Sequence, residues 1–261
     1  MAFRVLSYNI HQGLTVHRRQ LALSLLKDAI RSLKADVVLL QEVAGRTRGR
    51  ISDDTVMDSY QLEALADRIW PYYAFGRNAV FSGGFHGNAI LSRFPICRYE
   101  NVDISIRLVK NQGHIRMLPR RGLLHAEITL PEGFPSAHVI GTHFGLLNYE
   151  RQRQLQKLCD YVKGAIPSAS PFLVGGDFND WHERITPRLC RALKVEEAYH
   201  SRHARHARTF PSRFPVLALD RIYFRGLQLT DVDRLNGKPW KLLSDHLPIL
   251  ADFLVGPQAN A

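Results

Sequence analysis

The stretch FLVGGDFND, residues 172–180, decides how this chain folds and where its chemistry lies. Its apolar start predicts a buried strand, and Gly175 and Gly176 then allow the backbone to turn sharply and a ligand to approach closely. Asp177 and Asn179 would point to the same side if the extended geometry continued, which places an acceptor and an amide on one surface. The alternative is a Gly-Asp turn closed by an Asx hydrogen bond.

Seven further short runs resemble this strand, because they are rich in Val, Ile and Leu and bounded by Gly, Pro, Asn or Asp. The predicted strands are Phe3–Ile10, Asp36–Val43, Asn88–Ser92, Gly122–Leu130, His138–Phe144, Pro171–Gly176, Asp220–Phe224 and Pro248–Leu254. Apolar stripes at helical spacing predict core-facing helices around Leu21–Leu33, Leu62–Ile69 and Leu155–Val162. Strands and helices alternate without a break in composition, which predicts one α/β domain over residues 1–255 and a frayed tail at 256–261.

The charge balance is strongly basic, with 35 Lys and Arg against 24 Asp and Glu and a net charge of +11. A basic surface attracts polyanions such as nucleic acid, anionic lipid headgroups or phosphorylated small molecules. Two segments without any acid, Arg107–Arg121 and Tyr199–Val216, hold nine of these positive charges. They are either solvated loops or the borders of a site for a phosphate-bearing substrate. The candidate substrate-binding residues in them are Arg116, Arg120, Arg121, Arg205 and Arg208.

Other compositional features exclude some classes of protein. The three cysteines are far apart and no CxxC occurs, so we expect reduced thiols and neither a disulfide framework nor a zinc site. His200, His203 and His206 are spaced by three, but the arginines between them favour a basic loop over a metal cluster. No signal peptide and no apolar run of about 18 residues is evident, so the expected location is the cytoplasm.

Polar residues stand at the ends of three other predicted strands. Asn9 lies near the end of VLSYNI, Glu42 near the end of VVLLQEV, and His143 near the end of HVIGTHF. Alone, each is compatible with a strand end that reaches solvent or with a satisfied core histidine. A carboxylate that follows four apolar residues is costly to bury unless it is paired or bound to a metal.

The last strands carry a further histidine and two carboxylates. Asp245 and His246 are neighbours in SDHLPIL, and neighbours along a strand point to opposite faces. Asp220, in LDRIYF, comes from a different strand and is therefore the better candidate to orient the imidazole of His246.

Taken in order, seven short motifs carry these residues: YNI, QE, GNAILSRFP, TH, GGDFN, LDRIY and SDH. This series resembles the endonuclease/exonuclease/phosphatase superfamily, which includes pancreatic-type deoxyribonucleases, neutral sphingomyelinases and inositol-polyphosphate phosphatases. The resemblance covers residues 9 to 246, nearly the whole chain. It implies a four-layer α/β sandwich, in which two packed mixed β-sheets are flanked by helices and the site lies where the strand ends meet.

The resemblance also implies roles for single residues. Glu42 would bind Mg²⁺ or Mn²⁺ with help from Asn9 and Asp245, since hard cations prefer oxygen ligands. The implied catalytic residues are His143, Asp177, Asn179, Asp220 and His246. Within this set Asp177 is the candidate general base, and the division of acid and base roles between the two histidines stays open. The motif with Asn88 implies a residue that steadies the site and contacts substrate.

Two departures from the motifs of one branch of the superfamily narrow the range of expected substrates. His11 stands where the abasic-site endonuclease branch has an aspartate, and THFG replaces that branch's Tyr-containing segment. The chain therefore looks more similar to the deoxyribonuclease, sphingomyelinase and tyrosyl-DNA phosphodiesterase side. We expect phosphodiester hydrolysis in nucleic acid, with a phospholipid headgroup or a small phosphate ester as the alternative substrate. An inactive anion-binding scaffold is a third possibility, which the complete polar set argues against. No stable protein partner is implied.

Overall fold

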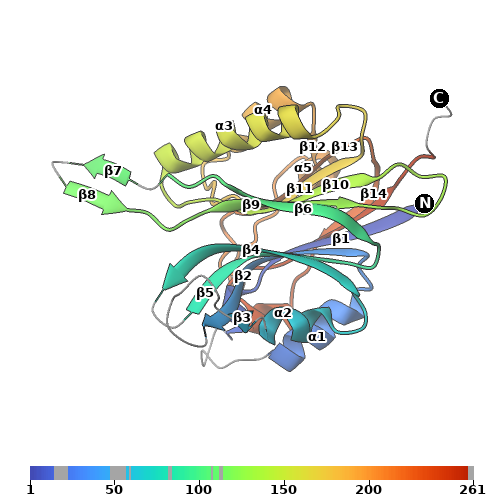
Figure 1. Ribbon diagram of the computed structural model, residues 1–261, viewed down its shortest axis with the longest axis horizontal. Helices are drawn as coiled ribbons and strands as arrows, with labels where there is room; N and C mark the ends of the chain where they lie inside the picture. Colours follow the sequence, from blue (N-terminus) through green and yellow to red (C-terminus); the bar gives the residue numbers. More distant parts are fainter. Residues whose placement is uncertain are drawn as a thin grey trace.

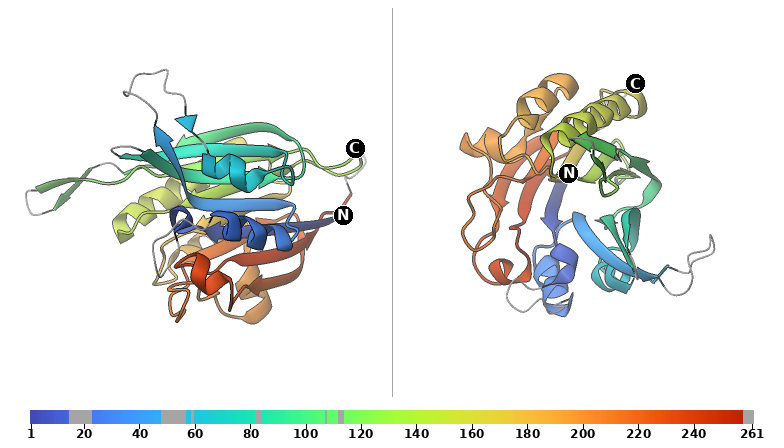
Figure 2. Two further views of the ribbon diagram at one scale, coloured as in Figure 1. Left: turned by 90° about the horizontal axis from the view of Figure 1, so that it is seen from below. Right: turned by 90° about the vertical axis from the view of Figure 1, so that its left-hand side faces the viewer.

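Four layers build the protein, as the computed structural model shows for residues 1–14, 23–47, 57–58, 60–81, 84–106, 108–111 and 114–257. Two β-sheets pack face to face, and helices cover the outer side of each (Figure 1). This is the α/β sandwich that the sequence predicts. Figure 2 (right) shows it from the end at which strands β7 and β8 project.

The first sheet has seven strands in the order β14-β15-β1-β2-β5-β4, with β3 paired to β2. Only β1 and β2 run parallel to each other in it. Its strands are β1 (Ala2–Asn9), β2 (Val37–Thr47), β3 (Met57–Asp58), β4 (Tyr72–Phe81), β5 (Gly84–Ser92), β14 (Gln228–Arg234) and β15 (Ile249–Leu254).

The second sheet has six strands in the order β12-β13-β11-β10-β9-β6, and here β10 and β11 are the parallel pair. Its strands are β6 (Ile96–Asp103), β9 (Gly122–Ile128), β10 (Ala137–His143), β11 (Phe172–Asp177), β12 (Glu196–Glu197) and β13 (Asp220–Arg225). A separate hairpin of β7 (Leu108–Asn111) and β8 (His114–Met117) projects from the body of the molecule (Figure 1).

Apolar side chains fill three spaces between the layers. Phe3, Leu39, Ile90, Val139 and Leu173 belong to the core between the two sheets. Outside the first sheet lie α1 (Leu23–Ser32), α2 (Tyr60–Ala66) and α6 (Trp240–Leu243); outside the second lie α3 (Asn148–Ala165) and α4 (Ile185–Leu193). The short elements η1 (His11–Gly13) and α5 (Ala198–His203) complete the described chain.

The topology explains why polar residues collect at one edge of the sandwich. The parallel pairs β1/β2 and β10/β11 end at this edge, and the antiparallel strands β13 and β15 begin there. Strand ends from both sheets therefore meet at a single place, although their residues lie far apart in the sequence.

Gly176 serves a different purpose from the turn predicted for it. The strand β11 continues through it to Asp177, and Gly176 pairs with Thr142 of β10. Its φ is +148°, and a Cβ at this position would lie 1.9 Å from the carbonyl oxygen of Thr142. Only glycine allows the two backbones to approach so closely just before the site.

Some compositional expectations can be compared directly with the structure. All three cysteines are free. None of the helices in the described ranges is long and apolar enough to cross a membrane. Of the three spaced histidines, His206 Nδ1 lies 3.0 Å from Glu197 Oε2 and His203 Nε2 lies 3.2 Å from the carbonyl oxygen of Val232. The ring of His200 lies against that of His206, with 5.0 Å between the centroids.

A buried histidine pair joins β9 and β10 away from the strand ends described above. Tyr161 donates a hydrogen bond to Glu100, so its oxygen accepts from His125 Nδ1 at 2.8 Å. His125 Nε2 then accepts from His138 Nδ1 at 3.1 Å. Burial, together with the neighbouring His138, lowers the pKa of His125 to about 4. The fold therefore holds this imidazole neutral.

This pair predicts an acid-sensitive fold. Unfolded His125 takes up a proton below about pH 6.5, whereas the folded protein does so only near pH 4. The free energy of unfolding should therefore decrease as the pH falls through this window, by about 2 kcal/mol from this residue. Urea denaturation at pH 7.0 and 4.5 measures the change, and His125→Gln should reduce it. His182→Gln, at an exposed position, is the control; equal acid sensitivity in wild type and His125→Gln would contradict the prediction.

Candidate active site

The candidate active site lies at the edge where strand ends of both sheets meet. His143, Asp177 and Asp220 are register partners across β10, β11 and β13, so the pairing of three strands sets them side by side. In the first sheet Asn9 ends β1 opposite Gln41 of β2. The sequence-predicted residues thus converge from two sheets.

Asp177 stands at the centre of this group. Its Oδ2 accepts a hydrogen bond from Asn9 Nδ2 at 3.2 Å, and it lies 3.5 Å from His143 Nε2 and 3.7 Å from His246 Nε2. All four side chains are buried. One carboxylate oxygen is therefore surrounded by three nitrogen-bearing groups.

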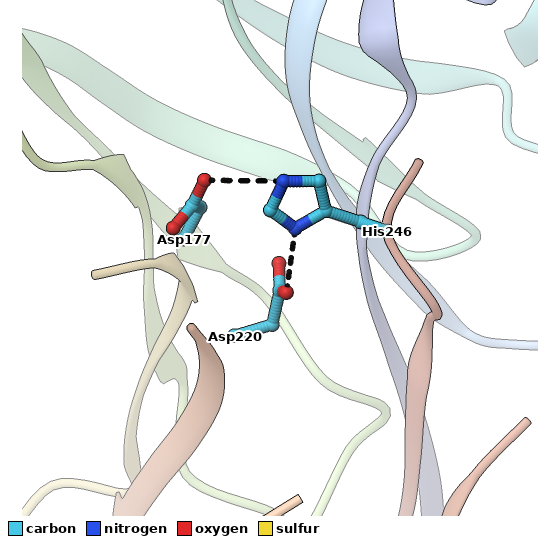
Figure 3. A group of neighbouring side chains, drawn as sticks. All are labelled: Asp177, Asp220 and His246. Atoms are coloured by element: carbon cyan, nitrogen blue, oxygen red, sulfur yellow. Dashed lines mark hydrogen bonds and ion pairs between the residues drawn. The ribbon is translucent and has the colours of Figure 1, made fainter. Parts of the chain in front are cut away.

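His246 lies between two carboxylates, as Figure 3 shows. Its Nδ1 is 2.8 Å from Asp220 Oδ2, while its Nε2 faces Asp177. The distance to Asp220 is the one expected for an orienting carboxylate. Thr209 donates a second hydrogen bond to the same oxygen of Asp220 at 2.5 Å, and its hydroxyl in turn accepts from the Asp220 amide at 3.3 Å. Thr209 is absent from the sequence-predicted site.

The protonation states follow from burial and from these neighbours. Burial lowers the pKa of His246, but the Asp220 and Asp177 carboxylates outweigh it and raise that pKa to about 10. Burial raises the pKa of Asp177 to about 6, although the adjacent His246 opposes the shift. Burial also lowers the pKa of His143 well below its usual value, as does the charge of Arg121. At neutral pH the site therefore holds an imidazolium, a carboxylate and a neutral imidazole.

Asn179 does not continue the extended strand geometry. Its φ is +48°, its backbone amide donates to Asp177 Oδ1 at 2.9 Å, and its side-chain amide donates to the Phe144 carbonyl at 2.9 Å. The Asx hydrogen bond of the alternative interpretation is thus present. Asn179 lies directly beside Asp177 and ties the loop after β11 to the loop after β10.

Glu42 and Asp245 lie next to Asn9. Glu42 follows Gln41, the register partner of Asn9, at a β-bulge where its φ is +57°. The Ser244 hydroxyl donates to the Asn9 carbonyl at 2.7 Å, which sets Asp245 beside the end of β1. Asp245 and His246 lie in a bend before β15, so the strand alternation used in their prediction does not apply there. The separation of the two side chains nevertheless occurs, since Asp245 Oδ1 faces His11 Nδ1 at 3.4 Å.

The arrangement offers two sets of groups that could hold a cation. Among the described residues, Asp177, Asp220 and His246 form the only group of three or more acidic, histidine or cysteine side chains whose ligand atoms lie within 4.8 Å of one another. The hydrogen bond between His246 and Asp220 occupies two of these atoms. The second set, Glu42, Asn9 and Asp245, offers hard oxygen atoms, which suit Mg²⁺ or Mn²⁺. Asn9 ends β1 and Asp245 lies in the bend before β15, whereas Glu42 lies at a bulge inside β2 and not, as predicted, near the end of its strand.

Arg121 brings a positive charge into this region. It is buried, and its Nε has no hydrogen-bond partner among the described residues. Burial lowers its pKa, which the carboxylates of Glu150, Asp177 and Glu42 oppose. A buried guanidinium with a free donor can bind a phosphate oxygen.

The other predicted substrate-binding residues are placed less closely. Arg120, Arg205 and Arg208 are exposed, and the side chain of Arg116 on β8 lies outside the described part of the chain. Both basic segments reach the site: the first through Arg121, the second through Thr209 and Phe210, whose ring centroid is 5.0 Å from that of His246.

Asn88 connects the two sheets. Its side-chain amide on β5 donates to the carbonyls of Gly122 on β9 and Gly141 on β10, at 3.1 and 3.5 Å. Its Oδ1 is buried and has no partner among the described residues. These contacts let Asn88 steady the site by tying β5 to β9 and β10, and its contact with substrate stays a prediction.

The amino-acid sequence of this chain is similar to those of known proteins. The profile of the Endonuclease/Exonuclease/phosphatase family matches residues 6–246. Over 253 residues the chain is 40% identical to a protein of Escherichia coli (strain K12) named Uncharacterized protein YbhP, covering 97% of this chain and 96% of that protein.

Solved structures with the same fold are more distant in sequence. One is an endonuclease/exonuclease/phosphatase from Beutenbergia cavernae DSM 12333, with a TM-score of 0.77, 18% identity, and coverage of 98% of this chain and 72% of that one. Another is D. rerio TDP2 complexed with a single strand DNA product, with a TM-score of 0.68, 17% identity, and coverage of 97% and 99%. The family profile spans nearly the whole chain and all seven ordered motifs, so this chain belongs to the endonuclease/exonuclease/phosphatase family.

Proposed function

We propose that this protein is a divalent-metal-dependent phosphodiesterase and that its substrate is nucleic acid. The convergence of Asn9, His143 and His246 on one oxygen of Asp177 carries the proposal. Phosphoester hydrolysis requires a positioned water, neutralised equatorial oxygens and help for the leaving oxygen. The site has a separate group for each of these tasks.

Asp177 is the proposed general base. With a pKa of about 6 it is ionised at neutral pH yet close enough to that pH to accept a proton from water. Its Oδ1 accepts from the amide of Asn179, and its Oδ2 from Asn9, so the carboxylate is held in a single orientation.

His246 and Arg121 are the proposed partners of the phosphate. Asp220 keeps His246 cationic, so its Nε2–H can donate to a phosphoryl oxygen. Arg121 supplies a second buried positive charge. His143, held neutral by burial, is the proposed group beside the leaving oxygen, where one ring nitrogen can donate without a full charge.

Glu42 is the proposed principal metal ligand, assisted by Asp245 and by the amide oxygen of Asn9. When bound, Mg²⁺ or Mn²⁺ polarises the phosphoryl oxygen as a Lewis acid. Asn9 Oδ1 also accepts from the backbone amide of His11 at 3.1 Å, which holds this oxygen in place.

Nucleic acid is the proposed substrate because of the charge distribution. Phosphate contacts dominate affinity for nucleic acid, and both basic segments reach the site. D. rerio TDP2, a structural relative, is described with a single strand DNA product, which supports the same class. A phospholipid headgroup is the second candidate, favoured by the tip of the second basic segment, where Phe214 is 81% exposed.

A substrate screen tests the proposal directly. Purified protein with Mg²⁺, Mn²⁺ or EDTA is incubated with bis-p-nitrophenyl phosphate, p-nitrophenyl phosphate, plasmid, single-stranded oligonucleotide and phospholipid vesicles. We expect metal-dependent hydrolysis of the diester and of nucleic acid. Faster hydrolysis of the monoester or of lipid would reassign the substrate, and inactivity on every substrate would favour the anion-binding scaffold.

Replacement of the metal ligand should abolish turnover but keep the fold. We expect Glu42→Ala to lower metal-dependent kcat by at least about two orders of magnitude, a typical loss for a charge-stabilising group. Rates at rising Mg²⁺ and Mn²⁺ measure it, with circular dichroism to verify folding. Glu63→Ala on α2 is a control for the loss of an acid elsewhere. Near-wild-type rates at saturating metal would remove Glu42 from the metal site.

A further inference from the structure

Two exposed aromatic side chains border the candidate active site. Trp181 is 38% exposed and Tyr149 is 53% exposed, whereas the other two tryptophans, Trp70 and Trp240, are buried. Exposed aromatic rings beside a catalytic site are groups on which a ligand can pack. Neither ring has a place in the hydrolytic mechanism above.

Both rings lie shortly after catalytic strands in the sequence. Trp181 comes two residues after Asn179, in the loop that follows β11. Tyr149 lies in the first turn of α3, after the loop that follows His143 of β10. The hydrogen bond from the Asn179 side chain to the Phe144 carbonyl, at 2.9 Å, joins the two loops. The rings are therefore attached to the backbone that positions the reacting groups.

The guanidinium group of an arginine lies over each ring. The guanidinium of Arg151 lies 5.4 Å from the centroid of Trp181, and that of Arg153 lies 5.3 Å from the centroid of Tyr149. Arg151 is itself buried and donates from Nη1 to the Leu146 carbonyl, so its position is fixed by the loop after β10. A guanidinium over a ring occupies one of its faces and leaves the other face for a second flat group.

We infer that Trp181, backed by Arg151, forms a stacking platform for an unpaired base of a single-stranded nucleic acid whose phosphodiester lies at Asp177. The inference rests on the proposed phosphodiesterase function and specifies its substrate. Bases stack on exposed aromatic rings while arginines beside them neutralise the backbone, and this platform combines both features. Within a duplex the bases stack on one another and offer no free face, so the platform selects single strands.

The same arginines argue against a membrane at this surface. Insertion of Trp181 and Tyr149 into lipid would carry the guanidinium groups of Arg151 and Arg153 toward the apolar region. Burial of such a charge in hydrocarbon is unfavourable, and Arg151 is tied to Leu146 and cannot extend away from the ring. A nucleic acid strand requires no such burial.

The fluorescence of Trp181 gives a binding test that needs no turnover. A single-stranded oligothymidylate is titrated into the protein in EDTA, with a duplex of equal length and anionic phosphatidylglycerol vesicles as parallel titrants. We expect the single strand to quench the emission and the duplex to have a much weaker effect, and Trp181→Phe should lose the response. Equal quenching by duplex, no quenching by the single strand, or a blue shift with vesicles alone would overturn the inference.

Kinetics give a second, independent test. Stacking of one base contributes a factor of about 5 to 150 in affinity. We expect Trp181→Ala to lower kcat/KM for the oligonucleotide about tenfold or more relative to kcat/KM for bis-p-nitrophenyl phosphate, which has no base. Tyr99→Ala, at a 57% exposed aromatic on β6, should leave this ratio unchanged. An equal loss on both substrates would overturn the platform, whereas failure of wild-type protein to hydrolyse either diester would overturn the proposed function alone.

Discussion

Asp177→Asn should lower kcat by about three orders of magnitude, since a positioned general base contributes a factor of about 10² to 10⁴. The asparagine has the same shape and can still accept from the amide of Asn179. It removes the negative charge on which Asn9, His143 and His246 converge, and it cannot take a proton from water. Initial rates on bis-p-nitrophenyl phosphate with Mg²⁺ or Mn²⁺ measure the loss.

The stability of this variant separates a chemical effect from unfolding. Burial raises the pKa of Asp177 to about 6, so the ionised carboxylate is less favourable in the folded protein than in the unfolded chain. Above pH 6 the neutral asparagine avoids this cost. We therefore expect Asp177→Asn to melt at the wild-type temperature or higher while it is inactive. More than a tenth of wild-type activity in a folded variant would rule out the role of general base.

Asp220→Asn is expected to lower kcat by between about two and three orders of magnitude, because an orienting carboxylate fixes the tautomer and charge of its histidine. Asp220 Oδ2 is the atom that both His246 and Thr209 contact, at 2.8 and 2.5 Å. Without its charge, His246 loses the main interaction that keeps it cationic. The Mg²⁺ concentration for half-maximal activity should stay the same, since Asp220 is not among the proposed metal ligands.

Thr209→Val is the matched control for this second prediction. It removes one hydrogen bond to Asp220 but keeps the carboxylate and its charge, so the loss should be closer to tenfold. A large rise in the half-maximal Mg²⁺ concentration in Asp220→Asn, with kcat nearly unchanged, would instead assign Asp220 to the metal. The roles of Asp220 and Asp245 would then be exchanged.

Much of the fold was predictable because buried strands can be recognised in the sequence as apolar runs. All eight predicted strands occur, and their ends differ by a few residues. The longer strands that were not predicted, β4, β6 and β14, lie at sheet edges, and many of their residues are exposed, so that no apolar run is needed there. The short strands β3, β7, β8 and β12 were not predicted either. Helix α4 was also overlooked, although Ile185, Leu189 and Leu193 are buried at a spacing of four residues and carry a helical signal.

The site was predictable to the extent that its residues stand at strand ends within recognisable motifs. Thr209, by contrast, lies in a loop, and its contact with Asp220 depends on a chain path that no local pattern encodes. The same applies to the stacking of Arg151 on Trp181, which joins α3 to a loop 30 positions further along the chain. The φ of +48° at Asn179 likewise contradicts the extended geometry that its spacing from Asp177 indicated.

The pairing of β1 with β15 has a consequence for synthesis of the protein. Ala2–Asn9 finds its antiparallel partner only in Ile249–Leu254, and His246 reaches Asp177 and Asp220 only when that last strand has docked. A ribosome-bound chain therefore carries an incomplete site until His246 and strand β15 have been translated and have docked. If the substrate is nucleic acid, the messenger is protected from the nascent chain until that strand has emerged.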